Sequence, residues 1–323
     1  MSENCESLSI ANAYAQALVE AGDLHPELVI LDADLPDSCI TEPFYAAHPG
    51  RAFDVGVAEQ SLPTIAAGLA LMGKIPFYNT FAVFAVNRGL DMIRQSVAYN
   101  RANVKIVGHA AGQSLGYAGP SHHSLEDISA MRAIPNLVIL SPCDAEQTRQ
   151  MVLWMADYQG PVYLRLPRSD VPPVHATGYR FEVDQCELLR DGGDISIFVT
   201  GDLVTLALEV QQQLEAQGIQ AQVVNVPCIK PLPAEQIVRY GEQTRAALTL
   251  EDHNIYGGLG SAVAEVYAEF LEQPLKRIGI PDTFTESDDR QVLLQAYGVS
   301  LENTLQQAHQ LLGKASRPGG KHA

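Results

Sequence analysis

Hydrophobic and polar positions follow two alternating periods along most of the chain. Residues 9–22 carry apolar side chains at helical spacing, and residues 27–35 form a short apolar run typical of a strand buried on both faces. The same succession continues, with strands predicted at 52–57, 75–81, 104–110, 137–142 and 161–167 and helices between them at 61–73, 83–100, 124–134 and 144–157. Strands that alternate with helices predict an α/β fold built on a parallel sheet.

The alternation is interrupted once and then resumes. Residues 169–194 are rich in proline, glycine and acidic side chains, which is typical of a crossing between domains. Beyond it we expect strands at 195–201, 220–226 and 245–252 and helices at 203–218 and 261–271. The prediction is therefore two parallel-sheet domains, the second one smaller, divided as residues 1–175, a linker at 176–193, residues 194–315, and a disordered tail at 316–323 that has no apolar face to bury.

Composition narrows the class of partner. A chain of 323 residues is long enough for two cores, and its formal net charge of −17 disfavours nucleic acid or an anionic membrane as the main partner. No leader and no apolar run of membrane-spanning length is visible, so we expect a cytoplasmic protein. The five cysteines are scattered without a C-x-x-C spacing, which indicates neither a disulfide framework nor a zinc site.

One carboxylate stands out in the stretch "FDVGVAEQ", residues 53–60. Glu59 follows an apolar run and precedes a predicted helix, an arrangement that presents a side chain at the edge of a sheet. Taken alone, a glutamate in this place is more often a helix-start carboxylate favoured by the helix dipole. The sequence motifs before and after Glu59 are needed to choose between a functional carboxylate and a helix-start carboxylate.

The glycines of "YGGLGSAVAE", residues 256–265, also precede a helix and could be taken for a phosphate-binding loop. The G-x-G-x-x-G order and an acidic ribose contact downstream are both missing. We therefore expect these glycines to serve a tight turn and helix packing.

Several segments, in order, resemble the C-terminal half of a transketolase. They are "DVGVAEQ", "NTFAVF", "GYAGPSHH" with "MRAIPNLVILSPCD", "YLRLPRS", and "EDHNIYGGLGSAVAE" with "LKRIGIPDTFTES". The resemblance covers nearly the whole chain and implies a pyrimidine-binding domain followed by a transketolase C-terminal domain, as in the small subunit of a split transketolase.

The resemblance also implies a cofactor and a partner. Enzymes of this class use thiamine diphosphate and Mg²⁺, which they hold with a G-D-G…N segment on a different domain, and this sequence has no such segment. A partner subunit is therefore expected to supply the diphosphate and Mg²⁺ anchor, and the expected assembly is an α2β2 heterotetramer.

By this resemblance, Glu59 is the carboxyl group that activates the cofactor's pyrimidine ring. Phe81 and Phe84 match the aromatic residues against which the ring lies, although aromatic residues three apart are also typical of core packing. Asn87 replaces a third aromatic residue of the family. Asp34 resembles a carboxylate near the thiazolium ring, and a turn or cap aspartate is the equally weighted alternative.

The resemblance gives the substrate a separate group of residues. His122 matches a catalytic histidine that hydrogen-bonds the donor, while Ser38 and Arg168 match residues that hold its terminal phosphate; a structural loop histidine and a surface ion pair are the alternatives for His122 and Arg168. His109 is a substitute for a family histidine expected one position later. The sequence departs from the family pattern at three positions where charged or polar contacts are usual, Ala11, Ala110 and Ala118.

Together these features predict the small subunit of a thiamine-diphosphate-dependent transketolase that moves a two-carbon ketol unit from a ketose-like donor to an aldehyde acceptor. The departures predict a donor with an unusual tail. Two alternatives stay open: a β subunit of a 2-oxoacid dehydrogenase E1 or a deoxyxylulose-phosphate-synthase-like enzyme, and a non-catalytic assembly subunit.

Overall fold

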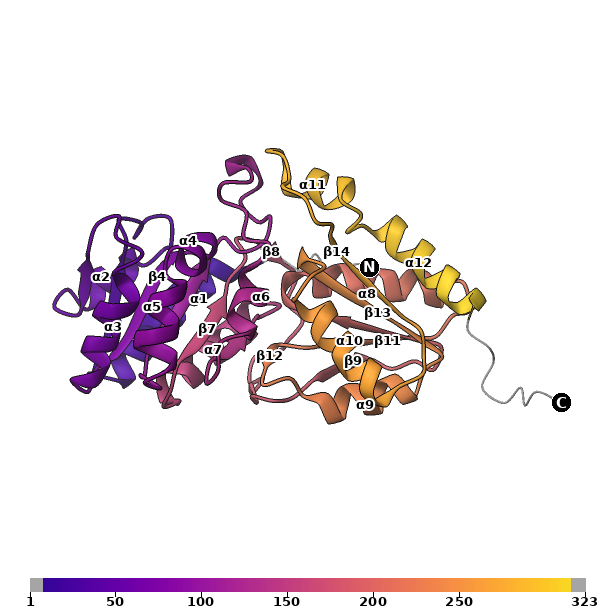
Figure 1. The fold of residues 1–323 in the computed structure, drawn as a ribbon, viewed down its shortest axis with the longest axis horizontal. Helices are drawn as coiled ribbons and strands as arrows, with labels where there is room; N and C mark the ends of the chain where they lie inside the picture. Colours follow the sequence, from indigo (N-terminus) through magenta and orange to yellow (C-terminus); the bar gives the residue numbers. More distant parts are fainter. Residues whose placement is uncertain (1–7, 315–323) are drawn as a thin grey trace.

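Two large sheets covered by helices lie side by side in the computed structural model, which describes residues 8–314 (Figure 1). A separate two-stranded sheet pairs β1 (Leu8–Ser9) with β8 (Asp170–Val171). The predicted α/β class with two sheets is confirmed. The tail predicted at 316–323 lies outside the described residues. No helix between residues 8 and 314 is long and apolar enough to cross a membrane.

The first sheet has seven strands in the order β12-β6-β7-β5-β4-β2-β3, and all are parallel except β12, which runs antiparallel to β6. Every residue of β2, β4, β5, β6 and β7 is buried, as expected for strands covered on both faces. The strands are β2 (Leu28–Asp32), β3 (Ala52–Asp54), β4 (Ile75–Phe81), β5 (Lys105–His109), β6 (Val138–Leu140), β7 (Val162–Arg165) and β12 (Cys228–Lys230).

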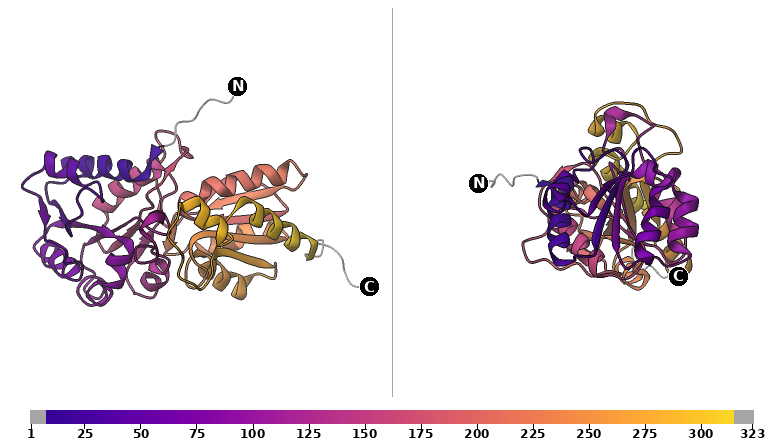
Figure 2. Two further views of the ribbon diagram at one scale, coloured as in Figure 1. Left: turned by 90° about the horizontal axis from the view of Figure 1, so that it is seen from above. Right: turned by 90° about the vertical axis from the view of Figure 1, so that its left-hand side faces the viewer.

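Helices cover both faces of this sheet, as Figure 2 shows in its right-hand view. One core contains residues of α1, α2 and α7, and the opposite core contains residues of α3, α4 and α6 and of the π-helical segment η1. These elements are α1 (Ile10–Leu24), α2 (Glu42–Ala47), α3 (Leu62–Leu71), α4 (Ala82–Asn87), η1 (Ile93–Ala98), α6 (Asp127–Arg132) and α7 (Ala145–Asp157).

The second sheet has five strands in the order β14-β13-β10-β11-β9. Of its four strand pairings, only the pairing of β9 with β11, at the edge, is antiparallel. The elements of this half are β9 (Glu187–Arg190), β10 (Ile195–Val199), α8 (Val204–Glu215), β11 (Ala221–Asn225), α9 (Ala234–Glu242), β13 (Ala246–Asn254), α10 (Leu259–Phe270), β14 (Leu275–Ile280), α11 (Arg290–Ala296) and α12 (Leu301–Lys314).

The helix predicted over residues 83–100 is interrupted in the structure. It divides into α4, a short α5 (Leu90–Met92) and η1, with Arg88 and Gly89 in a turn between the first two. A glycine inside a helix loses more backbone freedom than any other residue, which weakens the helix there. A Cβ at Gly89 would lie 2.6 Å from the carbonyl oxygen of Ala85, so no larger residue fits this turn.

The strand predicted over residues 52–57 is shorter than expected. β3 ends at Asp54, whose carboxylate accepts the N–H of Gly56 at 2.8 Å. Gly56 has a φ of +73°, a conformation that glycine adopts without steric cost. The chain therefore turns before Glu59 and places it in the loop that leads into α3.

The crossing between the sheets contains more regular structure than its sequence indicates. Residues 187–190 of the predicted linker form β9, the edge strand of the second sheet. Strand β12 returns from the second half of the chain to extend the first sheet. β14, α9, α11 and α12 were also missed. β14 and α11 are short, whereas α9 and α12 have a clear amphipathic pattern that the sequence analysis did not use.

Candidate active site

The carboxyl ends of the parallel strands of the first sheet gather all the predicted site residues at one edge. Parallel strands end at the same edge of a sheet, which is where α/β proteins commonly bind ligands. Asp34 and Ser38 follow β2, and Glu59 follows β3. Phe81 ends β4, and Phe84 lies in the first turn of α4. His109 ends β5, His122 lies in the next loop, and Arg168 follows β7.

Glu59 is buried, with 4% of its side chain exposed, although it belongs to a loop. Its Oε1 accepts a hydrogen bond from Nη1 of Arg88 at 2.9 Å. The Arg88 side chain is 51% exposed, and its guanidinium carbon lies 4.3 Å from the centre of the Phe84 ring. One planar cation thus contacts both the carboxylate and the aromatic ring, so both side chains face one common space.

An apolar cluster continues this space towards His122. The rings of Phe81 and Phe84 lie 6.1 Å apart, and His122 meets both edge-on, at 6.0 and 5.3 Å. Leu35 and Ala110 pack in the same cluster. His122 Nδ1 is bound to the hydroxyl of its neighbour Ser121 at 2.9 Å, which leaves the other ring nitrogen without a protein partner among residues 8–314.

His109 is buried beneath this edge. Its Nε2 lies 3.2 Å from Oδ1 of Asn79, which also accepts the hydroxyl of Tyr14. Burial, aided by the positive charge of Arg168, lowers the pKa of His109 to about 3. His109 is therefore neutral at physiological pH. Arg168 itself is exposed, so its guanidinium can meet a ligand or a partner.

The loop after β2 holds the remaining predicted residues. Asp34 is exposed and has a left-handed backbone with φ of +60°, fixed by its N–H donating to Asp54 at 2.9 Å. Ser38 is partly buried, and its N–H donates to Asp37 at 2.6 Å. Asp32, at the end of β2, is fully buried, and burial raises its pKa to about 7 despite a hydrogen bond from Thr41.

Two residues at this edge were missed by sequence reasoning. Arg88 stands four residues after Phe84 in a predicted helix, a spacing that places two side chains on one face and could have pointed to their contact. Asn79, inside β4, reads as an ordinary strand residue, and only the tertiary structure brings it to His109 and Tyr14.

The three alanines that depart from the expected pattern lie near the same edge. Ala110 is buried with φ of +53° against Phe81. Ala11 is buried at the start of α1, where the N–H of Ile10 donates to the carbonyl of Ser169, beside Arg168. Ala118 ends a short 3₁₀ turn in the loop before His122.

The glycine-rich segment 256–260 does not present a free helix terminus. The carboxylate of Glu251 accepts the N–H groups of Leu259 at 2.6 Å and Gly260 at 2.9 Å. A Cβ at Gly258 would lie 2.0 Å from Oε2 of Glu251. These glycines therefore allow an internal carboxylate to approach the start of α10, as the packing interpretation predicts.

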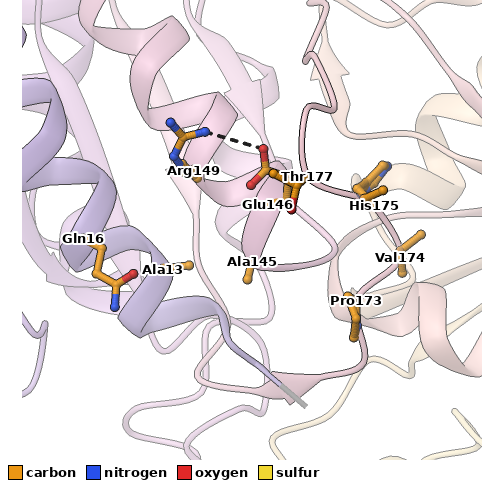
Figure 3. Close-up of a pocket in the computed structure, with 10 residues that line it drawn as sticks. Ala13, Gln16, Ala145, Glu146, Arg149, Pro173, Val174, His175 and Thr177 are labelled. Carbon is orange, nitrogen blue, oxygen red and sulfur yellow. Dashed lines mark ion pairs between the residues drawn. The ribbon is translucent and has the colours of Figure 1, made fainter. Parts of the chain in front are cut away.

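A large cavity is lined by none of the predicted site residues. It has a volume of about 740 Å³ and lies between α1, α7 and the segment 173–177, with Gln16, Glu146, Arg149 and His175 on its wall (Figure 3). A smaller cavity of about 330 Å³ adjoins the predicted edge and is lined by His123, Glu126 and residues 282–285. The volume of a cavity alone therefore does not identify the catalytic site.

Cys143, Asp144 and His175 approach one another without any short sequence motif. Their potential ligand atoms lie within 4.8 Å of one another. His175 is already bound through Nδ1 to Asp144 at 3.1 Å and through Nε2 to Glu187 at 3.2 Å. Hydrogen bonds and charge hold this group together, so no metal is required to explain it.

The residues at the carboxyl edge fit a planar, nitrogen-containing ring. Glu59 is buried and forms an ion pair with Arg88, which is half exposed. It can therefore exchange Arg88 for another hydrogen-bond donor. The adjoining aromatic cluster offers an apolar face for stacking. Within residues 8–314, this edge has no cluster of cationic side chains suited to a diphosphate.

Sequence models of two families match the chain. The model described as "Transketolase, pyrimidine binding domain" matches residues 6–173, and "Transketolase, C-terminal domain" matches residues 184–304.

Individual proteins show similarity over nearly the full length. A putative transketolase C-terminal section from Methanocaldococcus jannaschii is 43% identical, over 90% of this chain and 92% of its own. The 6-deoxy-6-sulfo-D-fructose transketolase subunit SqwH from a Clostridium species is 38% identical over 94% of both chains. A solved split-gene transketolase, described as an inactive β4 tetramer, is 42% identical with a TM-score of 0.89, covering 96% of this chain and 100% of the other.

Proposed function

This chain belongs to the transketolase family, and we propose that it is the small subunit of a split transketolase that transfers a two-carbon ketol unit from a ketose-like donor to an aldehyde acceptor. Transketolases depend on thiamine diphosphate, which supplies the carbon that carries the ketol unit between substrates. One observation carries the proposal: a buried carboxylate, Glu59, and an aromatic ring, Phe84, face the same space at the carboxyl edge of the sheet.

Glu59 is the proposed proton-holding group. A carboxyl group bound to the pyrimidine N1′ can share a proton with that nitrogen, and its burial keeps water from competing for the bond. Phe81 and Phe84 offer the apolar face for the ring, and Asp34 would lie towards the thiazolium side. Asn87 is committed elsewhere, because its side-chain amide donates to Glu126 at 2.7 Å.

Four side chains around this space are proposed to bind the substrate. His122 has a ring nitrogen available to the donor's oxygen, and the neutral ring of His109 can donate or accept one hydrogen bond. Arg168 and Ser38 would hold an anionic tail, since an exposed guanidinium binds such a group through two parallel hydrogen bonds.

The tail of the donor is proposed to be anionic but not that of an ordinary sugar phosphate. Ala11, Ala110 and Ala118 offer no charged or polar side-chain contact, whereas Arg168 remains. The relative from the Clostridium species, 38% identical, is named for a ketose with a sulfonate in place of a terminal hydroxyl. A sulfonate or a shifted phosphate fits one guanidinium better than a group that requires several cations.

The diphosphate and Mg²⁺ are proposed to be held by a partner subunit with a G-D-G…N segment, in an α2β2 heterotetramer. Within residues 8–314 of this chain, the edge around Glu59 has carboxylates and aromatic rings but no cluster of cations that would neutralise a diphosphate. The inactive β4 assembly described for the split-gene relative is consistent with a small subunit that needs its partner.

Calorimetry with and without the partner tests this proposal. We expect the isolated chain to bind thiamine diphosphate poorly in the presence of Mg²⁺, and the mixture of both subunits to bind it tightly and to turn over a ketose donor. Tight, Mg²⁺-dependent binding by the chain alone would contradict the split-subunit arrangement. Turnover of a 2-oxoacid but not of a ketose would favour an E1-type enzyme, and full turnover by Glu59→Gln would favour a non-catalytic assembly role.

A further inference from the structure

Arg88 makes the two contacts that the proposed function gives to the pyrimidine ring. Its Nη1 donates to Oε1 of Glu59 at 2.9 Å, and its guanidinium lies 4.3 Å from the centre of the Phe84 ring. A guanidinium is planar and carries N–H donors at its rim. An aminopyrimidine is also planar, and its ring N1′ can donate to a carboxylate when it holds the shared proton. Both groups therefore have the shape and hydrogen-bonding character to fill one place.

The two occupants exclude each other on chemical grounds as well. Arginine remains protonated at all relevant pH values and can only donate to Glu59. While Arg88 holds the carboxylate, Oε1 is occupied and the charge of Glu59 is neutralised by an ion pair instead of by a shared proton. The proposed proton exchange with the pyrimidine requires this ion pair to open.

The position of Arg88 allows its side chain to move away from Glu59. Half of its side chain is exposed, and it stands in the turn after α4, where the helix is interrupted before Gly89. Glu59, in contrast, is 96% buried and is held in the loop before α3. Arg88 is therefore the partner that moves, because water can solvate its guanidinium as soon as it leaves the carboxylate.

We propose that Arg88 is a gate that competes with the cofactor's pyrimidine ring for Glu59 and Phe84 and is displaced when the ring binds. This inference rests on the proposed function of Glu59. Before binding, the ion pair offsets the cost of burying the Glu59 charge, since an unpaired buried carboxylate is strongly unfavourable. Binding then has to break the ion pair, which weakens the apparent affinity for the cofactor.

Cofactor affinity in the assembled enzyme tests the gate. Calorimetric titration with thiamine diphosphate and Mg²⁺ would compare the wild-type complex with Arg88→Ala and with the control Arg94→Ala. Arg94 is exposed, lies six residues away in η1, and has no side-chain partner among residues 8–314, so its removal changes the net charge equally. We expect Arg88→Ala to bind about 3- to 30-fold more tightly and Arg94→Ala to match the wild type.

The possible outcomes separate this inference from the function on which it rests. If the wild-type complex does not bind thiamine diphosphate, the proposed function fails and the gate with it. If the wild type binds and a correctly assembled Arg88→Ala complex binds equally or more weakly, the gate alone is overturned.

A second measurement needs no variant. In a crystal structure of the wild-type complex with thiamine diphosphate bound, we expect the guanidinium of Arg88 beyond hydrogen-bonding distance of Glu59. An ion pair that persists beside the bound ring overturns the gate.

Discussion

The two sheets use the carboxylates at their carboxyl edges in opposite ways. Glu59 and Glu251 are both buried, and each stands within eight residues of the start of a helix. Glu251 binds two backbone N–H groups, whereas Glu59 has one side-chain partner among residues 8–314, Arg88, which is half exposed. Although the two sheets have similar topology, the carboxylate of the second sheet is occupied by its own chain, which makes this the closed edge, whereas the edge of the first sheet can accept a ligand.

The charged groups around the closed edge join the two halves of the molecule. Arg290 binds Asp202 at 2.7 Å and Asp252 at 2.9 Å, and Asp252 also accepts the N–H of Gln113, in the loop after β5 of the first sheet. In Figure 1 that loop and the α11 region project together above the two sheets. The paired charged groups at the edge of the second sheet therefore stabilise the arrangement of the two halves. Glu59, at the edge of the first sheet, has fewer partners and remains available for chemistry.

Substitution of Glu59 is the strongest test of this difference. In the assembled complex, Glu59→Ala is expected to lower kcat by about two to four orders of magnitude, the usual effect of removing a positioned proton-transfer group, with folding and assembly intact. Exchange of the cofactor's C2 proton, followed by NMR, reports the same step directly. Glu42→Ala, an exposed helix-start carboxylate, is the control, and an unchanged exchange rate in Glu59→Ala would exclude the role.

Substitution of Glu251 should affect stability instead of turnover. Glu251→Ala leaves two buried N–H groups at the start of α10 without an acceptor, so we expect the free energy of unfolding to fall by about 2–4 kcal/mol. Urea denaturation measures this loss, with Glu269→Ala on the exposed face of α10 as the control. If Glu251→Ala lowered kcat per folded enzyme as much as Glu59→Ala, the proposed difference between the two carboxylates would be wrong.

The junction beside β9 predicts a pH dependence of stability. Burial lowers the pKa of His175, but its bonds to Asp144 and Glu187 outweigh this and raise the pKa to about 9. A raised pKa in the folded state means that this stabilisation is complete below about pH 6.5 and is lost as the pH rises towards 9.

The expected slope between pH 6.5 and 9 is at most about 1.4 kcal/mol of unfolding free energy per pH unit. Denaturation curves across this range should show the slope in the wild type and in His309→Gln, an exposed control on α12, but not in His175→Gln. An equal slope in His175→Gln would show that other groups cause it.

Arg168 should give the smallest of these effects. Because a guanidinium that holds a remote anion binds the ground state and the transition state alike, Arg168→Ala is expected to raise KM for an anionic donor by about tenfold and to change kcat little. A neutral analogue of the same donor serves as the matched control and should be almost unaffected. Equal losses for both substrates would mean that Arg168 is structural.

Sequence periodicity was sufficient where an element buries a continuous apolar pattern. Strand β4 was predicted with its observed bounds, residues 75–81, because all seven of its residues are buried. It was insufficient for the helix at 83–100, where Gly89 interrupts a pattern that still reads as helical. Strand β9 was missed because it is a short edge strand with alternately exposed residues inside a segment that reads as a linker.

The same division applies to the site. The sequence alone determined the fold class and placed Glu59, Phe81 and Phe84 after strands of the first sheet, because segments that follow parallel strands start at one edge of the sheet. Only the tertiary structure decided which side chains share a space. The pairing of Glu59 with Arg88 joins residues 29 positions apart, and the closure of Glu251 depends on a helix that turns back onto its own strand. Such contacts depend on distances and burial across elements, which periodicity within one element does not encode.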